Sequence, residues 1–143
     1  MIDERAGVFA GAATGGVRAV LRLEGAGVFA AAAAVYGHLA PGWGWGWDVF
    51  ALAFLAPDLS FMGYLVGPRV GAVLYNAAHT YVGAVACVAV GVVWPGPAPA
   101  WLPAVGLIWA AHLGMDRALG YGLKYGVGFG ATHLGPIGRG RVW

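Results

Sequence analysis

The sequence predicts an all-α membrane protein: a four-transmembrane-helix bundle with a kinked second helix and a Gly-rich C-terminal tail. Composition gives the first reason, because 60% of the 143 residues are hydrophobic and only 10% are charged, whereas soluble domains carry about 25% charged residues. The second reason is that segments 25–47 and 70–115 contain no Asp, Glu, Lys or Arg. Since about 20 apolar residues cross a bilayer core, the first segment is long enough for one span and the second for two.

The first predicted span runs from about Val17 to Leu39 and ends at a Pro-Gly break. The second begins near Trp45 or Trp47 and continues to about Val66. It contains Pro57, which has no backbone N–H to donate and therefore predicts a kink where the chain reaches Asp58.

The third predicted span covers residues 70–93 and the fourth covers residues 102–121, with the proline-rich connection WPGPAPAW between them. These spans give three predicted regions, which are a poorly ordered N-terminal extension (1–16), the transmembrane domain (17–126) and a cytoplasmic tail (127–143).

The positive charges predict the orientation of these spans. The Lys and Arg residues all fall on one side of the predicted bundle, at Arg5, Arg18, Arg22, Arg69, Arg117, Lys124, Arg139 and Arg141. The loops on the other side, 40–47 and 94–101, contain none and hold five of the seven tryptophans. Because cytoplasmic loops are enriched in Lys and Arg and tryptophan favours the membrane boundary, we expect both termini in the cytoplasm.

Several classes of function are disfavoured by composition. The net charge of +2, with no nucleic-acid motif, gives no basis for binding DNA or RNA. The single cysteine, Cys87, excludes an internal disulfide and disfavours a cysteine metal site. The expected partners are therefore membrane lipids, and a homo-oligomer stays open.

Polar residues inside the predicted spans are the strongest functional signal. An ionisable side chain within a span costs roughly 2.5 to 3.5 kcal/mol, so it normally faces the bundle interior and pairs, binds or reacts there. At about 1.5 Å per residue, six such side chains from four spans lie roughly 8 to 15 Å from the cytoplasmic surface. They are Glu24, Asp58, Asn76, His79, His112 and Asp116.

Four of these residues, Asp58, His79, His112 and Asp116, are candidate metal ligands for zinc, iron or manganese. Helical bundles build such sites from inward-facing side chains, and His112 and Asp116 lie one helical turn apart. Glu24 is a candidate general base or further ligand. Two other interpretations stay open, a metal-free polar or catalytic cluster and purely structural pairing of an aspartate with an arginine.

The remaining polar residues have more ordinary interpretations beside a functional one. Asn76 is a candidate for orienting a ligand or an imidazole, and equally a source of interhelical hydrogen bonds. Arg69, Arg117 and Lys124 fit topology anchors, with binding of a phosphate or lipid head group as the alternative. Tyr75, like the other tyrosines, is expected at the membrane interface.

The sequence also resembles a bacterial membrane-protein family described as domain of unknown function 4260, over about residues 18–138. The matching blocks are Pro57-Asp58-Leu59-Ser60, Gly63-Tyr64, Gly67-Pro68-Arg69, Tyr75-Asn76, His79-Thr80, His112 with Asp116-Arg117, Gly120–Tyr125 and Thr132–Gly135. The resemblance implies residence in the bacterial cytoplasmic (inner) membrane and assigns no activity.

Two functions follow as expectations. The first is a metal-dependent enzyme that acts from the cytoplasmic half of the membrane on a lipid-like or apolar substrate. The second is a non-enzymatic membrane component, namely a small carrier, a proton-responsive subunit or a scaffold, in which Asp58 and His79 are protonation sites.

Overall fold

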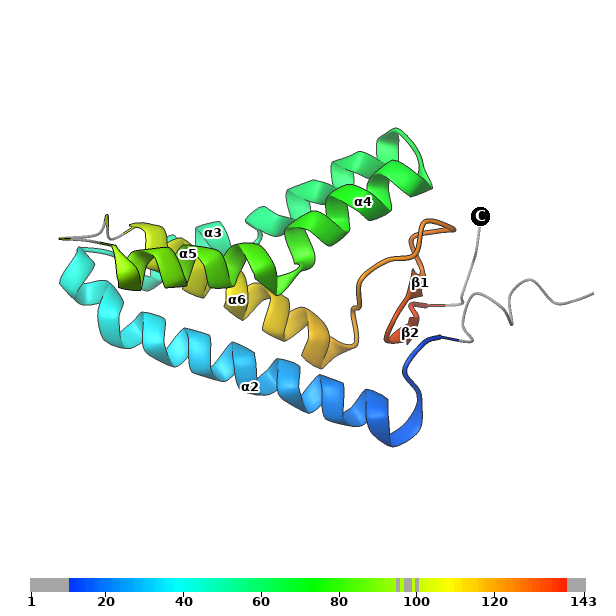
Figure 1. Cartoon of the computed structure of the whole chain (residues 1–143), viewed down its shortest axis with the longest axis horizontal. Coiled ribbons are helices and arrows are strands. Elements are labelled where there is room, and N and C mark those ends of the chain that lie inside the picture. The colour runs from blue at the N-terminus through cyan, green and yellow to red at the C-terminus, as the bar shows by residue number, and fades with distance from the viewer. Residues whose placement is uncertain (1–10, 95, 97–98, 100, 139–143) are drawn as a thin grey trace, which may run out of the picture.

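The structure is a computed structural model that describes residues 11–94, 96, 99 and 101–138. Within these residues the chain is mainly helical up to Leu119, and a non-helical segment with one very short β-hairpin follows (Figure 1). The helices are α2 (Gly15–Leu39), η1 (Ala40–Trp43), α3 (Trp47–Phe54), η2 (Ala56–Leu65), α4 (Pro68–His79), α5 (Tyr81–Val93) and α6 (Trp101–Leu119), and the strands are β1 (Ala131–Thr132) and β2 (Gly135–Pro136).

Three helical segments in the described residues are long and apolar enough to cross a membrane: Gly15–Trp43, Trp47–Leu65 and Pro68–Val93. Their surfaces agree with this, since large apolar side chains such as Leu52 (86% exposed) and Leu65 (84%) point outward. The helix of the fourth predicted span, α6, has the most buried residues, and it carries His112 and Asp116 of the candidate site. The all-α fold and three helical segments apolar enough to cross a membrane are therefore as predicted, while the fourth span stays a prediction.

Helix α6 packs closely against α2 along its length (Figure 1). The contact depends on glycines, because a Cβ on Gly25 would lie 2.5 Å from the Arg117 Cβ and one on Gly114 would lie 2.5 Å from the Phe29 nitrogen. Small residues of this kind allow helix backbones to approach in lipid, where packing rather than the hydrophobic effect holds helices together. Helix α6 is thereby fixed as the central element.

The second predicted span consists of two helices, with the α-helix α3 ending at Phe54 and the 3-10 helix η2 beginning at Ala56. Pro57 lies in the first turn of η2, where a missing N–H costs no hydrogen bond. Asp58 follows it, so the change of helix type occurs next to this carboxylate.

The third predicted span also differs from one continuous helix. Helix α4 ends at His79, Thr80 is extended with φ −90° and ψ 145°, and α5 begins at Tyr81. The reason lies in α6, where Trp109 Nε1 donates to the Ala78 carbonyl at 2.6 Å and Arg117 donates to the His79 carbonyl at 2.9 Å. These side chains satisfy carbonyls that a continuous helix would pair with its own next turn.

The segment after α6 folds back toward the helices. The Tyr125 N–H donates to the Ala131 carbonyl, and β1 pairs antiparallel with β2. Near the start of α2, the Ala13 N–H donates to the His133 carbonyl at 2.7 Å. The predicted boundaries of a tail at 127–143 and an extension at 1–16 stay predictions, and residues 1–10 and 139–143 lie outside the described residues.

Candidate metal centre

Four of the predicted site residues meet at one point in the interior. Asp58 lies in the first turn of η2, His79 is the last residue of α4, and His112 and Asp116 lie one turn apart on α6. The two histidines are buried, and the Asp58 side chain keeps 32% exposure. Residues far apart in the sequence therefore form one mixed imidazole–carboxylate cluster.

The facing atoms of this cluster are close together. The two Nε2 atoms of His79 and His112 lie 3.2 Å apart. Asp58 Oδ1 lies 3.4 Å from His79 Nε2 and 3.5 Å from His112 Nε2. Asp116 Oδ2 lies 3.6 Å and 3.7 Å from the same two nitrogens. One donor atom from each residue lies within 4.8 Å of all the others.

These separations match the edges of a coordination tetrahedron. Zinc binds imidazole nitrogen and carboxylate oxygen at about 2.0 to 2.2 Å, which places ligand atoms about 3.3 to 3.6 Å apart. The nitrogen–nitrogen and nitrogen–oxygen distances fall close to this value. Five of the six separations between ligand atoms therefore suit a single bound cation, and the sixth, between the two carboxylates, lies within 4.8 Å.

The positions of the hydrogens on the two histidines also favour a bound cation. His79 Nδ1 lies 2.9 Å from the Tyr75 carbonyl oxygen, which only accepts, so Nδ1 carries the hydrogen and Nε2 presents a lone pair. In an unprotonated cluster, His112 Nε2 is the only one of the four facing atoms that can carry a hydrogen. At least three lone-pair atoms would then crowd together, and a metal ion between them removes this repulsion.

Tyr75 is the residue that sequence reasoning misplaced. Its side chain is buried rather than interfacial, at 1% exposure. Its ring stacks on the His79 imidazole with centroids 3.7 Å apart, and its hydroxyl donates to Asp116 Oδ2 at 3.2 Å. Such outer contacts orient ligands and fix the histidine tautomer. The available signal was spacing, since Tyr75 precedes His79 by one helical turn.

Arg117 does not pair with the carboxylates of the cluster. It is buried and donates from Nη1 to the Tyr121 carbonyl at 2.8 Å and from Nη2 to the His79 carbonyl at 2.9 Å. The ion-pair contacts found in the described residues all join a histidine to an aspartate of the cluster. The alternative interpretation, in which Asp58 or Asp116 pairs with Arg117 or Arg69, therefore has no ion pair to support it in the described part of the chain.

Asn76 holds the segment after α6 in place. Its Nδ2 donates to the Lys124 carbonyl at 2.8 Å, and its Oδ1 accepts from the Lys124 N–H at 2.7 Å. Its amide therefore binds the backbone of a segment that follows α6, which differs from the interhelical hydrogen bond that was one interpretation of the sequence. A catalytic part for Asn76 stays a prediction.

Lys124 is buried beside the cluster at 5% exposure. Its ammonium nitrogen lies 3.7 Å from the ring centroid of Phe129 and 4.8 Å from that of Tyr75. Burial lowers the pKa of Lys124 to about 8, against the opposing effect of the Asp116 and Asp58 carboxylates. A cation thus lies near the two aspartates without an ion pair to either in the described residues.

A cavity of about 310 Å³ opens next to the cluster. Its lining combines Asp58 and Asp116 with Lys124, four aromatic side chains and Ile137. A ligand in this cavity would reach the carboxylate side of the cluster, while the two imidazoles stay buried.

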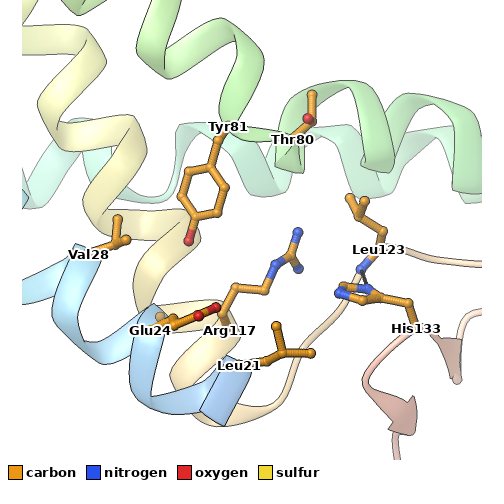
Figure 2. A pocket seen from close by; sticks show the side chains of 9 residues that line it. Leu21, Glu24, Val28, Thr80, Tyr81, Arg117, Leu123 and His133 are labelled. Carbon is orange, nitrogen blue, oxygen red and sulfur yellow. Dashed lines mark hydrogen bonds between the residues drawn. The ribbon is translucent and has the colours of Figure 1, made fainter. Parts of the chain in front are cut away.

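Glu24 lies in a different cavity, of about 340 Å³, between α2, α5, α6 and the segment after α6. Figure 2 shows Glu24, Tyr81 and Arg117 reaching into this cavity from α2, α5 and α6. His133 lines it as well, and burial lowers the pKa of His133, with nearby Arg117 adding to the effect. Glu24 is not among the four converging residues, and its predicted role as base or ligand stays a prediction.

Fold and cluster together define a helical protein with segments apolar enough to cross a membrane and an internal cluster of two histidines and two aspartates. The chain belongs to the family described as domain of unknown function (DUF4260), whose model matches residues 18–137. No curated protein and no solved structure matches the chain.

Proposed function

We propose that this protein is a membrane-embedded metalloenzyme that acts on a lipid-like or apolar substrate. One divalent ion, zinc, iron or manganese, would be held by Asp58, His79, His112 and Asp116. The observation that carries the proposal is the convergence of two imidazole nitrogens and two carboxylate oxygens at tetrahedral spacing, with a cavity at the carboxylate side.

The two imidazole nitrogens favour a transition metal over magnesium or calcium, which prefer oxygen ligands. Imidazole suits zinc and iron, and the two carboxylates suit manganese as well. A bound ion of this kind supplies Lewis acidity toward a substrate oxygen or water, or redox chemistry in the case of iron. The chain's own contribution is to fix the ligands through Tyr75 and Arg117 and to bury the imidazoles.

The placement in the bilayer completes the proposal. We infer that α6 forms the fourth span, that both termini are cytoplasmic and that the site opens in the cytoplasmic half of a bacterial inner membrane. The distribution of Lys and Arg supports this orientation. A reporter that is active only in the cytoplasm, fused after Trp143, should be active, and activity of the same reporter fused after Pro97 would overturn the topology.

The rival function, a carrier or proton-responsive subunit, needs Asp58 and His79 as protonation sites and an arginine as their counter-ion. Arg117 instead donates to two backbone carbonyls. This arrangement favours the metal-dependent interpretation over the rival one.

Elemental analysis of detergent-purified protein tests the proposal most directly. We expect about one transition metal ion per chain, as isolated or after reconstitution. Metal-loaded protein in nanodiscs should then convert a component of a bacterial lipid extract, detected by mass spectrometry, and the metal-free protein should not. Less than about 0.1 metal per chain with no gain on reconstitution would refute the metal site.

A further inference from the structure

Lys124 is a buried cation beside the cluster, and it forms no ion pair with the described residues. Lys124 is 5% exposed, and it lines the same cavity as Asp58 and Asp116. Its contacts in the described residues are the ring faces of Phe129 and Tyr75. A buried ammonium is costly unless it is paired, so this position needs a negatively charged partner.

The lysine is also held firmly in place. Asn76 binds both its backbone N–H and its carbonyl, at 2.7 and 2.8 Å, and Lys124 forms a β-bridge with Thr132. A rotation of the backbone that carried the ammonium out of the cavity would break these bonds. The backbone position of Lys124 beside the cavity is therefore fixed by the fold.

The charge balance determines the kind of ligand that fits, and this step rests on the proposed metal. A divalent ion with two aspartates is neutral, so Lys124 leaves the loaded cavity with a net charge of +1. The remaining lining is largely aromatic and apolar, including Phe61 and Phe129. A positive centre beside apolar walls is complementary to a molecule with an anionic head and an apolar body.

We propose that Lys124 is a substrate-binding residue that holds the anionic head, a phosphate or carboxylate, of an amphiphilic substrate next to the metal centre. The apolar part of that substrate packs against Phe61 and Phe129. Lysine binds phosphate as a point charge, and an anion reaching both Lys124 and the ion would bridge the two sides of the cavity.

Hexyl phosphate is a suitable probe, because it carries one anionic head and one short apolar chain. Its binding to metal-loaded protein in neutral-lipid nanodiscs is measured by calorimetry beside that of hexanol and inorganic phosphate. We expect hexyl phosphate to bind at least about tenfold more tightly than either fragment. Equal binding of hexanol would overturn the anion site, and equal binding of inorganic phosphate would overturn the amphiphile in favour of free phosphate.

Lys124→Met should weaken hexyl phosphate binding by about 10- to 100-fold, since a hydrogen bond to a charged group is lost. Lys124→Arg should retain most of it. The matched control is Arg69→Met, which removes an exposed cation that lines a separate cavity with Gly126 and Val127, and it should have no effect.

Metal content is determined on the same samples, so that the two proposals fail differently. Unchanged binding in Lys124→Met at full metal content would overturn this inference alone. A wild-type protein without metal would overturn the proposed function and this inference with it. If Lys124→Met does not fold, the comparison of the three probes in the wild-type protein still decides the matter.

Discussion

Two polar regions flank Arg117, and they differ in what their side chains do. On one side, Asp58, His79, His112 and Asp116 direct lone-pair atoms at one point. On the other side, Glu24, Tyr81 and His133 line a cavity without converging on each other (Figure 2). In the sequence, Glu24 of the second region was predicted at the same depth as the four residues of the first. The comparison teaches that depth identifies polar residues of a membrane protein, while convergence of donor atoms identifies a ligand set.

The largest test of this comparison removes one ligand from the cluster. His112→Ala should lower metal affinity by more than the about 10- to 100-fold that loss of an outer contact costs, measured by competition with a chromogenic chelator. Glu24→Gln, in the other region, should leave affinity within about threefold. Equal losses in both variants would show that Glu24 belongs to the ligand set and would remove the distinction.

An intermediate effect is expected at Tyr75. Tyr75→Phe keeps the ring stacked on His79 and removes only the hydroxyl that donates to Asp116. Metal affinity should fall by about tenfold in the same chelator competition, with unfolding in detergent little changed. No change in affinity would mean that Asp116 is oriented without this hydrogen bond.

The packing between the regions can be tested at Gly25, which lines the cavity of Figure 2. A Cβ at this position would lie 2.5 Å from the Arg117 Cβ and 2.8 Å from the Ala118 nitrogen. Gly25→Ala should therefore lower the free energy of unfolding by about 1 to 3 kcal/mol, measured by denaturation in mixed micelles. Gly27→Ala is the control, because nothing lies within 4 Å of its added Cβ, and it should be neutral or stabilising.

The smallest effect concerns His133, where the Leu123 N–H donates to Nδ1 at 2.8 Å. Burial lowers the pKa of this imidazole, so the unfolded chain takes up its proton first as the pH falls. The contribution of neutral His133 to folding stability is thus fully present above about pH 6.5. It is lost as the pH falls from there through the lower pKa of the folded state. Protonation breaks a hydrogen bond worth about 0.5 to 1.5 kcal/mol.

Hydrogen exchange of residues 123–136 at pH 7.5 and at lower pH measures this effect. Exchange should accelerate at the lower pH, after correction for intrinsic rates, in the wild-type protein. In His133→Gln the change should be smaller, and an identical change in both proteins would assign the pH dependence to another group.

The sequence predicted the membrane class, the approximate helix ends and the convergence of Asp58, His79, His112 and Asp116, because apolar length and polar depth are local properties. It did not predict the break at Thr80. That residue is neither glycine nor proline, and the donors that replace the helical hydrogen bonds, Trp109 and Arg117, come from α6. The burial of Tyr75 was missed for the same reason, since its partners depend on how α4 meets α6.

The helix breaks at Leu55 and Thr80 have a mechanical consequence. η2 and α4 pack on each other (Figure 1), and the breaks separate this two-helix arm, which carries Asp58 and His79, from α3 and α5. His112 and Asp116 belong to α6. An ion held by all four side chains would join this arm to α6. Because bilayer thickness affects the tilt of helical segments, it would then affect how closely the arm and α6 approach each other at the ion.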